Sequence, residues 1–344
     1  MPAAEPRTAG PAVPPGAPAG AGHGPGERRS VPAGLTVRVS VPATSANLGP
    51  GFDSMGLALD LRDEVVVTTV PTGFSARVEG EGAGSVPTDG SHLVIATLRD
   101  HLAARGWDVP GLELTATNRI PHGRGLGSSA AAHATAVLAA DALLPAAERA
   151  SASGLLDATS ALEGHPDNVA PALTGGLSVS WEEEGAYRSV RMDVHPDVVP
   201  VVAIPEEPLS TETARGLLPP QVSHAVAAAN AGRTALLVHA LTVDPALLLP
   251  ATRDWLHQDY REPAMPESVG LVHRLRERGL AAVVSGAGPT VMVLAAGDAA
   301  AGEAREALES ALGGSAQRWR VRVLPVDTTG AKVEAHRAGE PAQG

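Results

Sequence analysis

The stretch from Pro121 to Ala132, Pro-His-Gly-Arg-Gly-Leu-Gly-Ser-Ser-Ala-Ala-Ala, constrains the fold more than any other part of the chain. Glycines at positions 123, 125 and 127 allow positive φ, so that several N–H groups can point toward one anion. Serine is a favoured N-cap and alanine the best helix former. Residues 112–117 upstream alternate like a half-buried strand. Strand, glycine loop and helix N-terminus predict a phosphate site, although a plain tight turn is the alternative.

The loop matches neither of two common phosphate-binding motifs. It lacks the Gly-Lys-Ser/Thr of a Walker A loop and the glycine spacing of a dinucleotide-binding fold. The only lysine in the chain is Lys332, near its end. Any phosphate chemistry must therefore use backbone N–H groups, serines, arginines and a metal ion.

Composition narrows the class of protein. A chain of 344 residues suits about two domains. Its net charge of −12 argues against nucleic acid as a partner. The absence of cysteine excludes disulfides, thiolate catalysis and zinc–thiolate sites. Because no apolar run reaches the length of a membrane span, we expect a cytoplasmic protein with no membrane partner.

The composition along the chain predicts two domains between two tails. Residues 1–33 are dominated by Pro, Ala and Gly, so a disordered tail is expected there. An N-terminal domain is expected over 34–194 and a C-terminal domain over 195–330. Residues 331–344 are expected to form a loose tail.

Periodicity and turn residues predict the elements of both domains. Strands are expected at 35–41, 64–70, 112–117, 175–181, 198–204 and 320–326, and an apolar hairpin at 280–295. Helices are expected at 92–104, 128–144, 146–163, 222–241, 245–256 and 302–312. Between the first two strands, residues 42–56 are expected to form a long, turn-rich connection.

Polar residues gather in the turns of the N-terminal half. The long connection contains Asn47 and Asp53, and a Pro-bounded turn further along brings together His165, Asp167 and Asn168. Each of these residues could instead bond the local backbone or cap a helix. The second group, with an imidazole, a carboxylate and an amide together, indicates a site.

The C-terminal half offers fewer candidates. Ser210 or Thr211 is expected to cap a short helix, with Arg215 about one turn along. Arg261 follows a tyrosine in another Pro-bounded turn. Either arginine could simply be solvated. The Gly-Ala-Gly-Pro turn at 286–289 exposes its backbone between two apolar strands, as an ordinary buried hairpin also would.

Three separated stretches together resemble the GHMP kinases. They are Val41–Asp53, Pro121–Ala131 and Ser285–Thr290, and Gly164–Val169 supports the branch that phosphorylates L-homoserine. Gly-Leu-Gly-Ser-Ser-Ala is specific for the superfamily, and Asn-Leu-Gly-Pro-Gly-Phe-Asp for that branch. The resemblance implies an α+β fold with a ribosomal-protein-S5-like N-terminal domain, a ferredoxin-like C-terminal domain and an active site between them.

The resemblance also implies a reaction and its residues. ATP and Mg²⁺ would be the cofactors, and the γ-phosphoryl group would pass to the side-chain hydroxyl of homoserine, a step of threonine biosynthesis. The ATP phosphates would be wrapped by Pro121, His122, Gly123, Arg124, Gly125, Leu126, Gly127, Ser128, Ser129, Ala130 and Ala131. Substrate-binding positions would be Asn47, Asp53, His165, Thr211 and Arg261, and catalytic positions Asp167, Asn168 and Arg215.

The residue types suit that chemistry. Homoserine is a zwitterion, so its site needs a carboxylate for the ammonium and an arginine fork for the carboxylate. Asp53 fits the first role, and Arg215 with Arg261 fits the second. Phosphoryl transfer depends on positioning and charge neutralisation, so a lysine is not required. Asp167 or Asn168 could orient the hydroxyl while the phosphate itself takes the proton.

The metal ligands and the specificity leave alternatives. Ser128 or Ser129 would reach Mg²⁺. The acidic ligand would be Asp157, at the aligned distance, or Glu163, nearer the His165 turn. A mevalonate or sugar kinase of the same family is one rival function. A non-catalytic sensor of ATP or of an amino acid is another. A homodimer is the candidate assembly.

Overall fold

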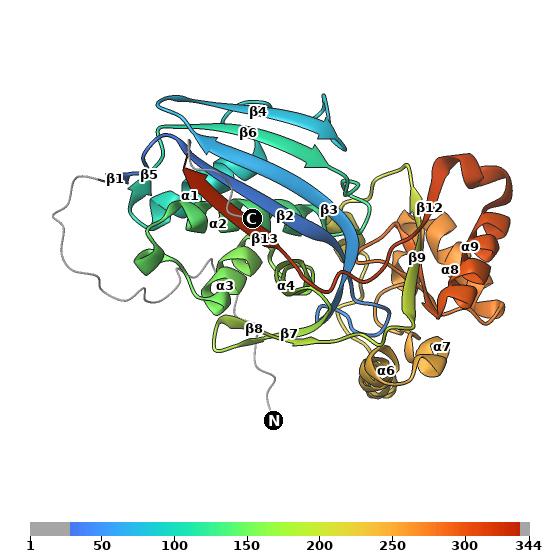
Figure 1. Cartoon of the computed structure of the whole chain (residues 1–344). Coiled ribbons are helices and arrows are strands. Elements are labelled where there is room, and N and C mark those ends of the chain that lie inside the picture. Colours follow the sequence, from blue (N-terminus) through green and yellow to red (C-terminus); the bar gives the residue numbers. More distant parts are fainter. Residues whose placement is uncertain (1–27, 338–344) are drawn as a thin grey trace.

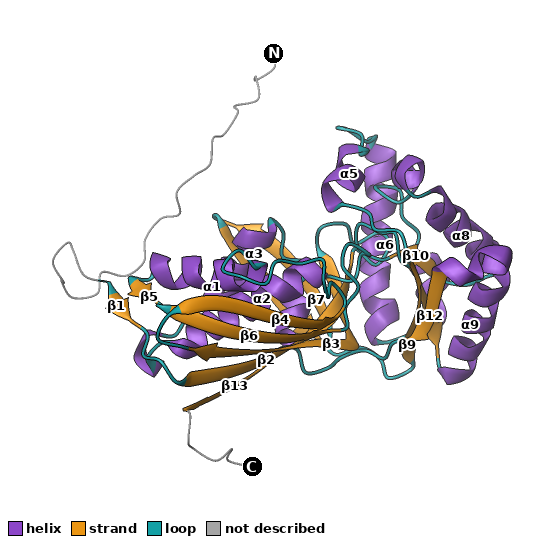
Figure 2. Cartoon of the chain, turned by 90° about the horizontal axis from the view of Figure 1, so that it is seen from above, coloured by secondary structure: helices purple, strands orange, loops and turns teal. Residues whose placement is uncertain are grey.

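The computed structural model describes residues 28–337 and places them in two units that lie side by side, each with a sheet and its own helices (Figures 1 and 2). The predicted tail at 1–27 lies outside the described residues. Within the described range, no helix has both the length and the apolar character to cross a membrane.

The first unit is built on a seven-stranded sheet in the described chain. Its main order is β13-β2-β3-β6-β4, with β7 on β3 and β8 on β7. The strands are β2 (Leu35–Ala46), β3 (Met55–Thr69), β4 (Gly73–Gly80), β6 (Gly111–Asn118), β7 (Leu177–Glu183), β8 (Ala186–Met192) and β13 (Lys332–Arg337). A short parallel pair, β1 (Arg29–Ser30) and β5 (Trp107–Asp108), lies beside it.

A bend in β2 and β3 carries this sheet toward the second unit. The register between the two strands shifts at Pro42/Ala43, which is typical of a β-bulge. The 15-residue β3 therefore pairs with β6 through residues 64–69 and with β7 through residues 55–57. Figure 1 shows this curvature. At its far end, the Ala46 carbonyl accepts a hydrogen bond from Gly286 N of the second unit, at 3.1 Å.

Helices cover one face of the first sheet (Figure 2). They are α1 (Leu93–Ala104), α2 (Ser128–Leu143), α3 (Ala152–Glu163) and α4 (Val169–Thr174), with a 3₁₀ turn η1 (Ala146–Glu148). The α2 helix buries mainly alanines, including Ala131, Ala134 and Ala140, in the core. Small side chains let this helix pack closely on the sheet, and so they fix the position of its N-terminus.

The second unit has a four-stranded antiparallel sheet in the order β10-β11-β9-β12. Its strands are β9 (Val198–Pro205), β10 (Ala282–Val284), β11 (Val291–Ala296) and β12 (Trp319–Val323). Its helices are α5 (Thr211–Gly216), α6 (His224–Thr242), α7 (Leu248–Ala251), α8 (Pro266–Glu277) and α9 (Asp298–Leu312), with the 3₁₀ turns η2 (Pro245–Leu247), η3 (Asp259–Ala264) and η4 (Gly313–Arg318). The strand order and the helical connections β9–β10 and β11–β12 match the expected ferredoxin-like domain.

Both faces of this second sheet are covered, which explains its uninterrupted apolar strands. On β9, Val201 and Ala203 pack in the cluster that includes α8 and α9. Their neighbours Val202 and Ile204 pack in the cluster that includes Leu237 of α6. Because successive strand residues point to opposite faces, each face receives apolar side chains.

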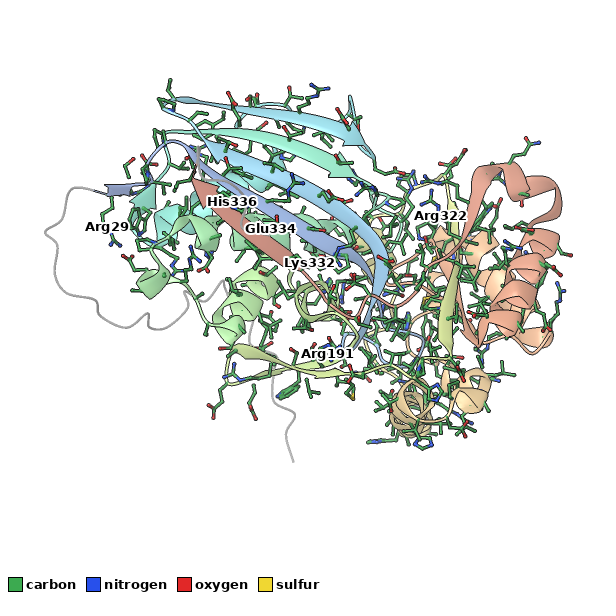
Figure 3. The ribbon with its side chains drawn as sticks, in the orientation of Figure 1. Arg29, Arg191, Arg322, Lys332, Glu334 and His336 are labelled. Carbon is green, nitrogen blue, oxygen red and sulfur yellow. The ribbon has the colours of Figure 1, made fainter. Side chains whose placement is uncertain are left out.

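The expected loose tail at 331–344 is wrong over part of its length. Residues 332–337 form β13, which pairs antiparallel with β2 from Lys332↔Ser40 to Arg337↔Leu35. Lys332, Glu334 and His336 lie along it in Figure 3. The strand is largely exposed, so backbone pairing holds it rather than an apolar pattern that the sequence could have shown. Residues 338–344 lie outside the described range.

At the other end, order begins before residue 34. Val31, within the predicted N-terminal tail, is 1% exposed and its N–H donates to Asp108 O at 2.8 Å. A two-residue strand, held by partners about 80 residues away, leaves no periodic signal in the sequence.

Several predicted elements have different limits in the structure. The turn-rich connection is shorter than 42–56, because β2 continues to Ala46 and β3 begins at Met55. The predicted helix 146–163 is the η1 turn followed by α3 from Ala152, and 245–256 is helical only to Ala251. Beyond α7, the Asp254 carboxylate accepts hydrogen bonds from the N–H groups of residues 256–258 and starts a new turn. The α8 helix was not predicted.

The return of the chain to the first sheet is secured by a buried ion pair. Asp327 is 6% exposed, pairs with Arg62 of β3, and accepts hydrogen bonds from Thr329 N (2.9 Å) and Gly330 N (2.8 Å). Arg62 also donates to Gly330 O at 2.6 Å. This cluster fixes the segment that enters β13.

We expect Asp327→Ala to lower the free energy of unfolding by about 3 to 5 kcal/mol, because it leaves the Arg62 charge buried without its partner. Urea unfolding followed by tryptophan fluorescence measures this. The exposed pair Arg77–Glu79 offers the control, since Glu79→Ala should leave the transition unchanged. Equal, small effects of both changes would contradict the role given to Asp327.

Candidate active site

A cavity of about 150 Å³ lies between the two units, and we call it the interdomain cavity. The first unit contributes its glycine loop, Asn47 and the turn after α3, while the second contributes α5, Arg261 and the turn between β10 and β11. The predicted site residues on its wall are Asn47, Gly123, Gly125, Gly127, Ser128, Ser129, Glu163, His165, Asp167, Asn168, Thr211, Arg215 and Arg261.

The glycine loop adopts the conformation that its sequence predicts. Gly123, Gly125 and Gly127 have φ values of 66°, 72° and 70°. Gly127 is itself the N-cap of α2, so the expectation that a serine caps this helix is wrong: Ser128 is its first residue. No side chain caps the helix and its first turn has no acidic residue. The free N–H groups and the helix dipole therefore make this N-terminus suitable for an anion.

Gly125 lies against the backbone of the second unit. A Cβ atom there would come within 2.2 Å of Ser285 O and 2.8 Å of Gly288 O. The Ser285 hydroxyl lies 2.6 Å from Gly125 O and 2.8 Å from the Ser45 hydroxyl. Only glycine allows the loop and the 285–288 turn to meet this closely.

The segment between β2 and β3 is strained. Asn47, Leu48 and Asp53 have φ values of 69°, 51° and 54°, in the left-handed region. The Asn47 side chain accepts from Asp53 N at 3.0 Å and donates to Gly286 O at 2.9 Å. Such conformations cost roughly 1 to 3 kcal/mol each for residues other than glycine, and they concentrate at functional sites.

Asp53 forms a two-point ion pair with Arg215 of α5. Arg215 Nη1 and Nη2 donate to the two carboxylate oxygens of Asp53 at 3.0 and 2.8 Å, and these hydrogen bonds raise the pKa of Arg215. The α5 helix itself is capped by Ser210, whose hydroxyl accepts a hydrogen bond from Thr213 N at 3.1 Å. Of the two predicted N-caps, Ser210 and Thr211, the N-cap is therefore Ser210.

Arg261 contributes a second positive charge, and it is 1% exposed. Burial, followed by repulsion from Arg215, lowers the pKa of Arg261 to about 10, so it remains charged at neutral pH. The ring of Phe52 lies beneath both guanidinium groups, 5.8 Å from that of Arg215 and 5.7 Å from that of Arg261. The aromatic ring helps to hold two like charges near one another.

The turn before α4 holds three polar side chains together. His165 Nδ1 lies 2.7 Å from Asp167 Oδ1, and Asp167 is 1% exposed. Burial lowers the pKa of His165, but the hydrogen bond and the charge of Asp167 outweigh it, so the pKa is raised. Asn168 Oδ1 accepts from the Thr44 hydroxyl at 2.8 Å, which leaves its NH₂ group to donate elsewhere.

The two candidate acidic metal ligands lie in different places. Glu163 lines the interdomain cavity, with His133 Nδ1 at 3.0 Å from its carboxylate. Asp157 does not line it, because its carboxylate accepts a hydrogen bond from Tyr187 N of β8 at 2.6 Å. The expectation for Asp157 is therefore not supported by the geometry. Within residues 28–337, no cluster of three His, Asp or Glu side chains could hold a metal ion by itself.

A second cavity of about 260 Å³ adjoins the first, and we call it the apolar cavity. Ser128 and Ser129 line both. Most of its wall is apolar, from Val65, Val86, Pro87, Leu93, Val94, Ala116 and Ala132, and its polar side chains include His92, Asn118 and His122. In the described chain, His92 Nδ1 is buried without a hydrogen-bond partner. Of the residues that line the apolar cavity, the sequence had indicated only His122, Ser128 and Ser129 as site residues.

Several predicted loop residues do not face the interdomain cavity. Leu126, Ala130 and Ala131 are buried in the core, and Pro121 is buried as well. The guanidinium of Arg124 donates to the carbonyls of His122 and Glu206. The only lysine, Lys332, lies on β13 (Figure 3) and lines neither cavity. Ala46, Leu209, Ser210 and the 286–288 turn also line the interdomain cavity, and only the Gly-Ala-Gly-Pro pattern had signalled that turn.

Comparison with known families agrees with this architecture of two units around a glycine loop. Residues 92–176 match the GHMP kinases N terminal domain, and residues 224–314 match the GHMP kinases C terminal domain. The chain therefore belongs to the GHMP kinase family.

Similarity to individual proteins shows to which branch of the family the chain belongs. The homoserine kinase of Streptomyces coelicolor is 53% identical over 298 residues, covering 86% of this chain and 94% of the relative. That of Clavibacter michiganensis is 48% identical over 308 residues, covering 89% and 96%. The crystal structure of homoserine kinase from Cytophaga hutchinsonii superposes with a TM-score of 0.75 at 27% identity, covering 87% and 97%. Within its family, the chain lies in the homoserine kinase branch.

We expect Gly125→Ala to lower kcat/KM by roughly 100-fold, because its Cβ would push the loop away from the 285–288 turn. Steady-state kinetics with a thermal unfolding scan measures this. Gly106→Ala is the matched control, since Gly106 also has positive φ (77°) but meets nothing within 4 Å. An equal loss of activity in both variants would show that backbone strain alone is responsible.

The raised pKa of His165 predicts a pH-dependent contribution to stability. The protonated form of His165 stabilises the folded state. This stabilisation is complete at pH values below the ordinary pKa of about 6.5, and it is lost as the pH rises through the raised pKa. The difference in Tm between the wild-type chain and His165→Gln should therefore be largest in acid and shrink on the alkaline side of 6.5. A difference that grows with pH would contradict this.

Proposed function

We propose that this homoserine kinase transfers the γ-phosphoryl group of ATP to the side-chain hydroxyl of L-homoserine within the interdomain cavity, using the residues described above. The observation that carries the proposal is a group of charges at this cavity: Arg215 and Arg261 line it, and Asp53 pairs with Arg215. The Phe52 ring lies against both guanidinium groups.

This arrangement complements a zwitterion. The homoserine ammonium would bind Asp53, and its carboxylate would bind the guanidinium groups of Arg215 and Arg261. Asp53 and Arg215 form an ion pair with each other in this structure. The substrate would replace this pair with two, one between its ammonium group and Asp53 and one between its carboxylate and the arginines. A sugar carries neither an ammonium nor a carboxylate group, and mevalonate carries no ammonium group. The charges of Asp53, Arg215 and Arg261 therefore favour the amino acid over these alternatives.

The nucleotide would span the two cavities. The N–H groups of the 123–127 loop and of the α2 N-terminus would hold the phosphates. The apolar cavity would receive the nucleoside, because it adjoins Ser128 and Ser129 and combines apolar walls with a few polar groups. His122 would contribute there, and Arg124 would support the loop through its bonds to the backbone.

The oxygen donors between loop and turn fit a magnesium ion. Mg²⁺ prefers oxygen ligands and usually binds through one or two carboxylates together with substrate phosphates. Ser128 and Glu163 both line the interdomain cavity and would hold it. When bound, the ion supplies positive charge that offsets the charge on the phosphates.

The turn at 165–168 would orient the reacting hydroxyl. Because Thr44 occupies Asn168 Oδ1, the Asn168 NH₂ group can donate to the substrate oxygen. His165 and Thr211 would fix the rest of the molecule, and buried Asp167 holds His165 in place. The hydroxyl oxygen forms the new bond to phosphorus, the bond to the ADP oxygen breaks, and the proton passes to the transferred phosphate.

Purified protein given ATP, Mg²⁺ and L-homoserine should release ADP and form O-phospho-L-homoserine, detected by ³¹P NMR. Ser128→Ala/Ser129→Ala should lower kcat about 100-fold or more by removing hydroxyls beside the phosphates. Ser75→Ala on the exposed face of β4 is the control and should keep wild-type rates. Faster turnover of mevalonate or galactose than of homoserine would overturn the substrate assignment, and ATP binding without turnover would favour a sensor.

A further inference from the structure

In the part of the chain that the structure describes, the Arg261 guanidinium makes its hydrogen bonds through one nitrogen, Nη1. Its Nη1 atom donates to His257 Nδ1 at 3.1 Å and to Gly286 O at 3.1 Å. Within residues 28–337, its Nε atom is buried without a hydrogen-bond partner. Two acceptors thus use the two hydrogens of Nη1, and the Nε–Nη2 edge is left for a ligand. That edge is one of the two that bind a carboxylate through parallel hydrogen bonds.

His257 is oriented by a second bond on the other side of its ring. Its Nε2 atom lies 2.7 Å from Gly49 O. A carbonyl can only accept, so Nε2 carries the proton, and a guanidinium can only donate, so Nδ1 presents its lone pair. The two neighbours therefore require one neutral tautomer of the imidazole.

The surroundings of the ring agree with a neutral imidazole. His257 is 0% exposed, and burial lowers its pKa, with Arg261 acting in the same direction. Asp254, whose oxygen is 3.7 Å from Nε2, and Asp53 oppose this. The Phe52 ring stacks on the imidazole with 5.1 Å between centroids and 25° between planes.

We propose that His257 is a positioning residue for substrate selection: it aims the Nε–Nη2 edge of Arg261 at the α-carboxylate of the amino-acid substrate. Because the same ring holds Gly49, it also ties this edge to the segment that carries Asp53. His257 is therefore one of the links that set the spacing between the carboxylate site and the ammonium site, beside the hydrogen bonds of Asn47 and Arg261 to Gly286 O. This inference rests on the proposed function, in which Arg261 and Asp53 bind these two groups.

The test compares homoserine with 3-aminopropan-1-ol, which has the same amino and hydroxyl groups but no carboxylate. In His257→Leu, kcat/KM for homoserine should fall about tenfold or more, because Arg261 is no longer aimed, while that for 3-aminopropan-1-ol changes little. The preference for homoserine over the analogue should therefore fall about tenfold. A merely structural role would lower both values equally and leave their ratio unchanged.

Two further variants separate the functions of the ring. His257→Asn keeps an acceptor near the position of Nδ1 and should restore most of the preference for homoserine. His257→Gln keeps a donor near the position of Nε2 and should not. If His257→Leu fails to fold, the comparison of these two variants decides. In an Arg261→Lys background, His257→Leu should cause no further fall in the ratio, since both act through the same contact.

His101→Leu is the matched control, since His101 also has a buried ring nitrogen but lies on α1, and it should leave both substrates unaffected. An unchanged ratio in His257→Leu, or equal ratios in the Asn and Gln variants, would overturn the inference. Absence of homoserine-dependent ADP release from the wild-type chain would instead overturn the proposed function.

Discussion

The contact between two backbones, that of Gly125 and that of the 285–288 turn, is the constraint on which the site depends. A Cβ at Gly125 would come within 2.2 Å of Ser285 O, so no side chain separates the two units at this point. The same turn accepts hydrogen bonds from Asn47 and Arg261 at Gly286 O. One turn of the second unit therefore fixes the glycine loop, the strained segment and the buried arginine relative to one another.

The strain in the 47–53 segment is maintained by the second unit. Pro50 O accepts hydrogen bonds from Asn230 and Thr234 of α6, at 2.8 and 2.7 Å, and Gly49 O bonds to His257. These partners lie about 180 to 208 residues away in sequence. Left-handed φ values at Asn47, Leu48 and Asp53 persist because the surrounding structure determines them from several sides.

Prediction from the sequence succeeded where a local pattern of residues is compatible with only one backbone conformation. The three glycines, the alanine helix after them and the apolar hairpin around Gly-Ala-Gly-Pro all formed where expected, because φ preference and periodicity act over a few residues. It failed where distant partners decide. Strand β13 exists because β2 offers it an edge. Of the two acids that the resemblance left as candidate metal ligands, Asp157 accepts a hydrogen bond from Tyr187 N and does not line the interdomain cavity. The apolar cavity joins β3, β6, α1 and α2, so no single stretch could reveal it.

The sequence by itself determined the conformation of the glycine loop, the apolar strands, the lack of any lysine but Lys332 and the kinds of charge available to a ligand. Those properties follow from backbone freedom and side-chain chemistry, which are local. Only the tertiary structure decided that Glu163, rather than Asp157, lines the interdomain cavity, and that Asp53 pairs with Arg215 across 162 residues. It also decided that His257 holds both Gly49 and Arg261. Hydrogen bonds and ion pairs act over a few ångströms, so their partners depend on how the two units pack.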